Sequence, residues 1–201
     1  MTLTSNIAIA ILAAGASKRM GSPKQLLKWE DSTIINHAIE TCKNTVVNDV
    51  IVVLGANYKD IIRDINDTSV TVIHNKKWTL GLGKSIAFAA QHCLGPKANR
   101  DGLLVVLADQ PYVTTSFLNK MIEAFHVDDE VILATEYDAH KKGVPVLFHK
   151  KHFEALGKLT GDDGAKSILK QQKASVKVIQ PDFKNIDIDT AQDYHKALKS
   201  L

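Results

Sequence analysis

Short apolar runs alternate along this chain with longer stretches in which apolar residues recur every three or four positions. The first pattern is typical of buried strands, and the second is typical of helices that turn one apolar face toward a core. The expected strands are Ile7–Leu12, Val50–Leu54, Val70–His74, Leu103–Leu107, Val131–Thr135, Val144–Phe148, Val176–Ile179 and Ile186–Ile188. The expected helices are Thr33–Cys42, Tyr58–Asn66, Lys84–Cys93, Ser116–Phe125, Lys150–Leu156, Ala165–Gln172 and Ala191–Leu198.

The alternation of strands and helices predicts an α/β fold, in which a mostly parallel sheet is the middle layer of an α/β/α sandwich. Leu103–Leu107 contains only apolar residues, as a strand covered by helices on both faces requires. The hydroxyl of Ser32 stands where it can cap the first long helix. The sequence has no internal repeat and no low-complexity tract, so we expect a single domain over residues 1–201.

Composition narrows the class of protein. A hydrophobic content of 45% lets the chain bury a core, which excludes a disordered protein, and a net charge of +3 is too small to favour a nucleic-acid partner. The longest apolar stretch, Ile7–Ala14, is far shorter than the roughly 20 residues of a membrane-spanning helix. Cys42 and Cys93 have neither a disulfide-scaffold nor a zinc spacing. We therefore expect a soluble, cytoplasmic protein with no nucleic-acid or membrane partner.

The loop after the first strand combines small residues with positive charge. Gly15 and its small neighbours let the backbone approach a ligand closely, and successive N–H groups in such a loop form a nest for an anion. Arg19 offers a forked contact and Lys24 a point charge, so a polyphosphate would satisfy the whole loop. On composition alone, a solvated glycine loop with surface lysines is an equally good interpretation.

Two acidic segments offer ligands for a metal ion. Asp109 follows the buried strand Leu103–Leu107, and Mg²⁺ favours one or two carboxylates together with phosphate oxygens. The alternative role of Asp109 is to cap the next helix, but Thr114 or Thr115 can do so instead. Near the carboxyl end of the chain, alternation on a short strand would place Asp187 and Asp189 on the same side, although Asp189 also precedes a helix that it can cap.

These segments carry a resemblance to a known family. The string Leu12-Ala13-Ala14-Gly15-x-Ser17-x-Arg19-Met20-Gly21-x-x-Lys24-x-Leu26-Leu27 resembles the signature of nucleotidyltransferases of the nucleotide-diphospho-sugar transferase fold. It is most similar to the MobA/MocA-like branch, which attaches a nucleotide to molybdopterin. The resemblance implies a Rossmann-like sandwich of the GT-A type. It also implies catalytic roles for Arg19, Lys24 and Asp109, and Mg²⁺ held by Asp109 and Asp189, with Asp187 as the substitute for Asp189.

A second glycine-rich segment, Gly81-Leu82-Gly83-Lys84-Ser85, resembles the segment that borders the nucleobase in this family. It is not a Walker loop, because Trp78 stands where that loop needs a glycine; a glycine turn that caps a helix is the alternative. The nucleotide-binding residues that the resemblance implies are Leu12, Ala13, Ala14, Gly15, Ser17, Gly21, Gly81, Gly83 and Ser85. The Leu-Ala-Ala-Gly string is closer to cytidylyl than to guanylyl relatives, whereas physical reasoning alone does not choose between CTP and GTP.

The acceptor side has weaker signals. Lys142, Gly143 and Pro145 resemble one family segment near the acceptor, and Asp162 and Lys166 belong to a Gly-Asp-x-Gly-Ala-type loop that resembles another. Taken one by one, these lysines are better explained as solvated surface residues than as contacts of an acceptor phosphate.

His149 and His152 are flanked by lysines, so we expect both on the surface. Trp29 and Trp78 are interpreted as packing residues or pocket walls, with packing favoured.

The hypothesis drawn from the sequence is transfer of CMP from CTP to the phosphate of molybdopterin, with release of pyrophosphate. Positioning and electrostatics would carry catalysis, because an acceptor phosphate is already a nucleophile near neutral pH. The alternatives are transfer from GTP to molybdopterin, cytidylyl transfer to a sugar or polyol phosphate, and a non-catalytic protein that delivers the cofactor to a molybdenum hydroxylase apoenzyme.

Overall fold

The computed structural model describes residues 5–95, 98–137 and 140–200. Its strands are β1 (Ile7–Ala13), β2 (Lys28–Trp29), β3 (Ser32–Thr33), β4 (Asp49–Leu54), β5 (Thr71–His74), β6 (Gly102–Leu107), β7 (Ile132–Tyr137), β8 (Lys141–His149) and β9 (Val176–Ile179). Its α-helices are α1 (Ile34–Lys43), α2 (Tyr58–Asp64), α3 (Leu82–Cys93), α4 (Thr115–Glu123), α5 (Phe153–Leu156), α6 (Lys166–Gln171) and α7 (Ala191–Leu198). Short 3₁₀ helices include Lys24–Leu26, Trp78–Leu80, Val127–Asp129, Lys150–His152 and Lys173–Ser175.

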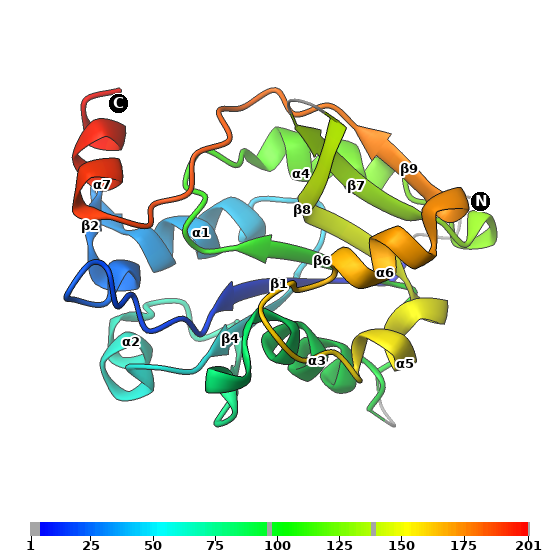
Figure 1. The fold of residues 1–201 in the computed structure, drawn as a ribbon, viewed down its shortest axis with the longest axis horizontal. Helices are drawn as coiled ribbons and strands as arrows, with labels where there is room; N and C mark the ends of the chain where they lie inside the picture. The colour runs from blue at the N-terminus through cyan, green and yellow to red at the C-terminus, as the bar shows by residue number, and fades with distance from the viewer. Residues whose placement is uncertain (1–4, 96–97, 138–139, 201) are drawn as a thin grey trace.

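The central sheet has the strand order β5-β4-β1-β6-β8-β7-β9 (Figure 1). The strands β5, β4, β1 and β6 pair in parallel, β8 is antiparallel to both of its neighbours, and β7 pairs in parallel with β9. Every strand of this sheet except β8 therefore runs in the same direction. This arrangement confirms the expected α/β fold with a mostly parallel sheet.

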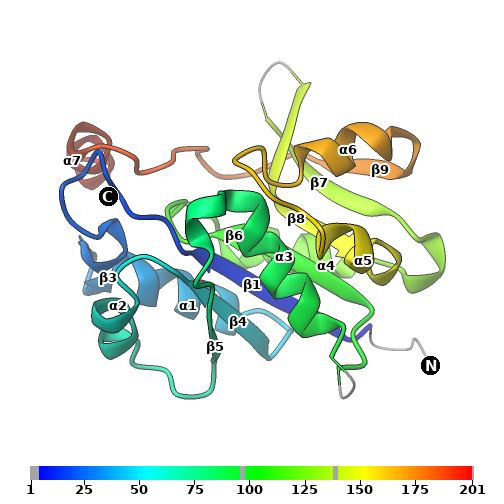
Figure 2. The same ribbon diagram turned by 60° about the horizontal axis from the view of Figure 1, so that its bottom comes forward.

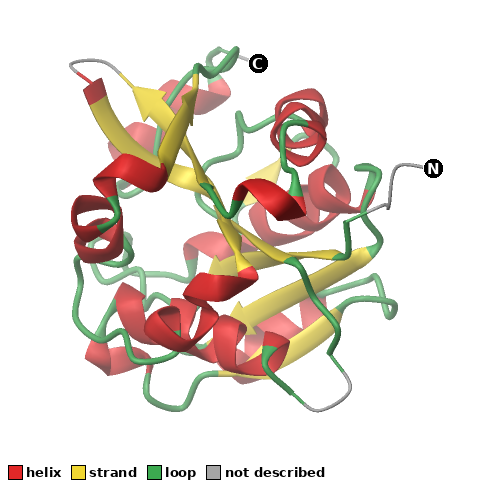
Figure 3. Cartoon of the chain, turned by 90° about the vertical axis from the view of Figure 1, so that its right-hand side faces the viewer, coloured by secondary structure: helices red, strands yellow, loops and turns green. Residues whose placement is uncertain are grey.

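Alternation along β1 shows how the sheet builds a core on each face. Ile7, Ile9 and Ile11 pack with the residues of α1, α2 and α4, whereas Ala8 and Ala10 pack with those of α3, α5 and α6. The helices thus form a layer on either side of the sheet (Figures 2 and 3). Because strand side chains alternate between faces, one strand contributes to both cores.

The carboxyl ends of the neighbouring strands β1 and β6 lie side by side at one edge of the sheet. Leu12 pairs with Leu107, and the next residue after β6, Ala108, donates its N–H to the carbonyl oxygen of Leu12 at 3.1 Å. The loop that follows β1 and the acid that follows β6 are therefore neighbours in space. Ligands of open parallel sheets gather at such an edge.

A third segment reaches this edge from the far end of the sheet. After β9 the chain runs as a strap (residues 180–190) past the carboxyl ends of the strands to α7, as the orange-to-red trace in Figure 1 shows. Ile188, which is fully buried, packs with Trp29, Ile34 and Ala197, and its N–H donates to the carbonyl oxygen of Asp109 at 2.9 Å. The strap is therefore fixed against the loop after β6.

The strand expected at Ile186–Ile188 is wrong, because these residues pair with no strand and Ile188 makes a single backbone bond to Asp109. The expected cap at Ser32 is also wrong: Ser32 belongs to β3, and Thr33 caps α1 by accepting from the N–H of Asn36. The expected helix cap at Thr114 is confirmed, since its side chain accepts from the N–H of Phe117.

The prediction that His149 and His152 lie on the surface is wrong. His149 and His152 are 3% and 4% exposed, and their rings lie near those of Phe125 and Phe148, respectively. The adjacent Lys150 and Lys151 are exposed. An exposed lysine therefore does not imply that the next residue in the sequence is exposed as well. Among the described residues, no helix has the length and apolarity needed to cross a membrane.

The two cysteines give a pH-dependent prediction. Burial raises the pKa of both the Cys42 and the Cys93 thiol to about 12, whereas an unfolded thiol ionises near pH 8.5. We expect neither thiol of the native protein to react with Ellman's reagent at pH 8, and both to react in denaturant.

The same pKa shifts predict how stability depends on pH. Because the pKa of each thiol is higher in the folded than in the unfolded protein, the stability contribution is complete below about pH 8.5 and decreases as the pH rises toward 12. A Cys42→Ala/Cys93→Ala variant should lose less stability over that alkaline range; an equal loss would contradict the prediction.

Candidate active site

A cleft of about 730 Å³ opens at the carboxyl edge of β1 and β6. The loop after β1 forms one wall, the glycine-rich start of α3 forms another, and acids from the β6 loop and the strap form a third. The lining residues are Leu12, Ala13, Ala14, Gly15, Ala16, Ser17, Lys18, Arg19, Lys24, Gln25, Ile34, Trp78, Thr79, Gly81, Leu82, Ser85, Leu107, Ala108, Asp109, Asp162, Asp187 and Asp189.

The loop after β1 is a compact turn. Ser17 and Gly21 have positive φ values of 53° and 71°, and the N–H of Met20 donates to the carbonyl oxygen of Ser17 at 2.9 Å. The Ser17 hydroxyl accepts from the backbone N–H of Lys24 at 3.1 Å. These contacts fold the loop back so that both Arg19 and Lys24 reach the cleft.

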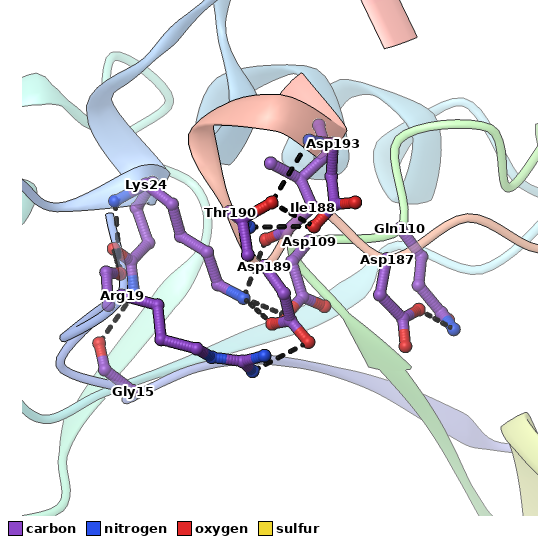
Figure 4. A network of polar contacts seen from close by, with 12 residues as sticks. Gly15, Arg19, Lys24, Asp109, Gln110, Asp187, Ile188, Asp189, Thr190 and Asp193 are labelled. Atoms are coloured by element: carbon purple, nitrogen blue, oxygen red, sulfur yellow. Dashed lines mark hydrogen bonds and ion pairs between the residues drawn. The ribbon is translucent and has the colours of Figure 1, made fainter. Parts of the chain in front are cut away.

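Lys24 is the centre of the polar network in Figure 4. Its Nζ donates to an oxygen of Asp109, to the carbonyl oxygen of Ile188 at 2.9 Å and to Oδ1 of Asp189 at 3.0 Å. These three contacts use all three protons of the ammonium group. Burial alone would lower the pKa of Lys24, but the carboxylates of Asp109 and Asp189 outweigh it and raise this pKa above its usual value. The lysine is therefore held as a cation.

Arg19 and Asp189 form the more open part of the network. Nη2 of Arg19 lies 2.9 Å from Oδ2 of Asp189, and the arginine side chain is 69% exposed. Burial would raise the pKa of Asp189, but Lys24 and Arg19 outweigh this and lower it. Asp189 is thus ionised and shared by two cations. Because Arg19 is largely in solvent, it can exchange this partner for an incoming anion at little cost.

Asp109 has one satisfied and one free carboxylate oxygen. One oxygen accepts from Lys24, whereas Oδ1 is buried and has no hydrogen-bond partner among the described residues. Burial raises the pKa of Asp109, and the Lys24 ammonium opposes that rise. A buried oxygen without a donor is costly, and a cation or a further donor beside it would remove that cost.

Asp187 and Gln110 form a separate pair beside this network. Nε2 of Gln110 donates to Oδ1 of Asp187 at 2.8 Å, as Figure 4 shows. The strand that would have put Asp187 and Asp189 on the same side is absent, and the two acids have different partners. Asp189 does not cap α7; Thr190 does, in a capping box with Asp193.

The glycine-rich wall is built by close backbone contacts. Gly81 has a φ of 90°, and a Cβ on it would lie 2.4 Å from the carbonyl carbon of Gly161. The N–H of Gly83 donates to the carbonyl oxygen of Gly161 at 2.8 Å. The two backbone segments are so close here that a side chain at Gly81 or Gly83 would clash. Beside it, the buried amide of Asn75 donates to the hydroxyl of Ser85 at 3.1 Å and fixes that side chain in the cleft wall.

The structure brings most of the predicted site residues together. The three predicted catalytic residues and Asp189 are joined by direct contacts, and the predicted nucleotide residues line the cleft except for Gly21 and Gly83. The predicted acceptor residues are divided. Asp162 lines the cleft, whereas Lys142, Gly143 and Pro145 on β8 and Lys166 at the start of α6 do not. The Trp78 side chain lines the cleft, and Trp29 is a core residue, 1% exposed.

Sequence reasoning missed Gln25, Asn75 and Gln110. Each is a buried amide: Asn75 directly follows β5, whereas Gln25 and Gln110 directly follow the predicted site residues Lys24 and Asp109. Polar residues directly beside strand ends and predicted ligands are the signal that would have found them, because a buried amide needs partners.

Comparison with known proteins identifies relatives over almost the full chain. A family model described as the MobA-like NTP transferase domain matches residues 9–176. Nicotine blue oxidoreductase of Paenarthrobacter nicotinovorans is 28% identical, with 94% of each chain covered, and purine catabolism protein PucB of Bacillus subtilis is 26% identical, with 94% of this chain and 95% of that protein covered. The bifunctional protein GlmU of Alkaliphilus oremlandii is 30% identical over 84% of this chain, which spans only 35% of GlmU.

Several solved structures are similar to this one over almost the whole chain. The Rv0371c homologue from Mycobacterium sp. strain JC1 superposes with a TM-score of 0.83 at 28% identity, covering 98% of both chains. Rv0371c of Mycobacterium tuberculosis, solved in complex with manganese, superposes with a TM-score of 0.81 at 25% identity, covering 98% of this chain and all of that one. A nucleotidyl transferase from Methanothermobacter, at 18% identity and a TM-score of 0.82, shares the fold.

The ion pair of Lys24 gives a prediction about stability. In Lys24→Met the buried carboxylate of Asp109 loses its partner, so the variant should be less stable by about 3 kcal/mol at pH 7. Without the ammonium group the pKa of Asp109 rises further; the penalty is therefore present at neutral pH and decreases as the pH falls and the carboxyl group is protonated.

Urea denaturation at pH 7 and pH 4.5 measures this effect. The matched control is Lys28→Met, an exposed lysine four residues away, which should change stability by less than about 0.5 kcal/mol. A Lys24→Met penalty that is the same at both pH values would show that charge pairing is not its cause.

Proposed function

Because the chain belongs to the MobA-like NTP transferase family, we propose that it transfers CMP from CTP to the phosphate of molybdopterin. The observation that carries the proposal is the shared network of Lys24, Arg19, Asp109 and Asp189 beside a loop of small residues. Cations and ionised acids around one cleft suit a ligand that carries both negative charge and a metal ion. Nucleotidyl transfer requires such a ligand.

The proposed reaction is an in-line displacement at phosphorus. An oxygen of the acceptor phosphate forms a bond to the α-phosphorus of the nucleotide, and the bond from that phosphorus to the bridging oxygen of the β-phosphate breaks. Pyrophosphate leaves with the electron pair of that bond. Arg19 and Lys24 stabilise the negative charge that builds on the α-phosphate and the leaving group. No side chain needs to remove a proton, since an acceptor phosphate with a second pKa of about 6 is mostly dianionic at neutral pH.

The acids of the cleft fit a divalent metal ion. The free, buried Oδ1 of Asp109 and the ionised carboxylate of Asp189 are hard oxygen donors, which Mg²⁺ and Mn²⁺ prefer. Within the described ranges no three His, Cys, Asp or Glu side chains form a ready metal cage, so we propose that Asp109 and Asp189 hold Mg²⁺ together with phosphate oxygens of the substrate. When bound, the metal would neutralise charge on the phosphates.

Lys24 occupies both proposed metal ligands, so the lysine and the metal ion compete for them. We expect weak Mn²⁺ binding by the protein alone and tighter binding when the nucleotide is present, because phosphate oxygens then supply ligands and attract the lysine. Electron paramagnetic resonance of Mn²⁺ measures both affinities. Asp109→Asn should weaken Mn²⁺ binding in the presence of nucleotide by at least tenfold, whereas Asp182→Asn, which changes an exposed acid on the strap, should not. Equal Mn²⁺ affinity with and without nucleotide would contradict the proposal.

The choice of CTP and of molybdopterin rests on the similarity of the first motif to cytidylyl relatives. GTP as donor, or a sugar or polyol phosphate as acceptor, would use the same phosphate contacts. Calorimetric titration with CTP, GTP, ATP and UTP in Mg²⁺ tests the base, and pyrophosphate release with molybdopterin or polyol phosphates tests the acceptor.

A different class of function is suggested by names alone. One relative is called an oxidoreductase, and a carrier that delivers a molybdenum cofactor to a hydroxylase apoenzyme would also need an anion-binding cleft. Pyrophosphate release by the wild type, and its loss in Asp109→Asn, separate nucleotidyl transfer from these alternatives. In the proposed enzyme, Asp109→Asn should lower kcat at least a hundredfold, whereas Asp182→Asn should leave kcat unchanged. A carrier or an oxidoreductase would show no pyrophosphate release in the wild type.

A further inference from the structure

Gln25 is a buried side chain beneath the loop that follows β1. It is 2% exposed, although it borders the cleft, and it lies in the 3₁₀ helix Lys24–Leu26 directly after the lysine of the polar network. Burying an amide group without partners costs about 1–3 kcal/mol. Its partners therefore explain why a glutamine stands at this position.

The Gln25 amide joins three points of the loop. Its Nε2 donates one hydrogen bond to the carbonyl oxygen of Ala13 at 2.9 Å and another to that of Gly15 at 3.0 Å. Its Oε1 accepts a longer bond from the Ser17 hydroxyl at 3.4 Å. Both amide protons and one acceptor position are thus used within a stretch of five residues, from the end of β1 to the positive-φ residue Ser17.

These contacts decide which backbone atoms are available to an anion. A carbonyl oxygen repels phosphate, whereas a backbone N–H attracts it. The carbonyl oxygens of Ala13 and Gly15 are bonded to Gln25, and that of Ala14 accepts from the N–H of Ala56 at 3.0 Å. Three successive carbonyl oxygens at the edge of the cleft are therefore held by donors of the protein itself.

Gln25 also couples the loop to the polar network. The Ser17 hydroxyl that contacts Gln25 accepts from the backbone N–H of Lys24, and Lys24 reaches Asp109 and Asp189. The amide therefore sets the position of the loop relative to the ammonium group. Rigid support of this kind is what a site needs when it acts by positioning and fixed charge.

We infer that Gln25 is a positioning residue for a polyphosphate ligand: it holds the loop carbonyl groups away from the phosphates and fixes the distance between the loop and Lys24. The inference rests on the proposed function, because it assumes that the loop and Lys24 bind the same phosphate chain. Gln25 itself need not contact the ligand.

The test replaces Gln25 by methionine, which keeps the volume and removes both donors, and by glutamate, which keeps the shape and puts an oxygen against the two carbonyl groups. The probe is inorganic tripolyphosphate with Mg²⁺, titrated by calorimetry. We expect Gln25→Met to weaken its binding about tenfold or more and Gln25→Glu to weaken it further. In turnover assays the KM for the nucleotide should rise, while the KM for the acceptor stays unchanged.

The matched control is Gln91→Met, which removes a similar amide-to-carbonyl bond (Nε2 to Gly157, 2.9 Å) on the exposed side of α3. It should leave tripolyphosphate binding unchanged. Ser17→Ala, which removes the hydroxyl that Gln25 contacts, provides a milder variant if both Gln25 variants unfold, and it should weaken binding by a smaller factor.

Two results would have different meanings. If the wild type binds tripolyphosphate and a folded Gln25→Met binds it equally well, the positioning role is overturned while the proposed function stands. If the wild-type protein itself does not bind tripolyphosphate in Mg²⁺, the proposed function fails, and the inference about Gln25 fails with it.

Discussion

The site depends on one ammonium group, that of Lys24, whose side chain is 13% exposed. Lys24 donates hydrogen bonds to a carboxylate oxygen of Asp109, to the carbonyl oxygen of Ile188 and to a carboxylate oxygen of Asp189. It therefore joins the loop after β1, the loop after β6 and the strap, which are far apart in sequence. Without that cation, the acids from the β6 loop and from the strap would repel each other across the cleft. The ion pairs therefore shape the cleft; they lower the pKa of Asp189 and oppose the rise that burial causes in the pKa of Asp109.

The sheet makes this convergence possible. The parallel neighbours β1 and β6 deliver their following loops to the same edge, and the bond from Ala108 to Leu12 extends that pairing by one residue. Close glycine contacts between the start of α3 and Gly161 form the opposite wall. Regular structure thus positions the charged groups of the cleft, although most of these groups lie outside it.

Much of this could be predicted from the sequence. Seven of the eight expected strands are present, and the inner ones, such as β1, β4 and β6, leave a strong local pattern because they are buried on both faces. The first motif gave the family, which the match over residues 9–176 confirms. Ile186–Ile188 was mispredicted because alternation is also produced by one buried residue, Ile188, in an extended segment without a strand partner. The contacts of Lys24 with residues more than eighty positions away carry no local signal at all.

The strap has a consequence for the order in which the cleft is completed during synthesis. Translation proceeds from the amino end, and the sheet is complete in sequence once β9 has been made. A ribosome-bound chain of that length already has the loop after β1, Lys24 and Asp109, but it lacks Asp187, Asp189 and the apolar anchor Ile188. Such a nascent chain therefore has the whole sheet and an incomplete cleft, and the cleft is completed only after the strap has been synthesised.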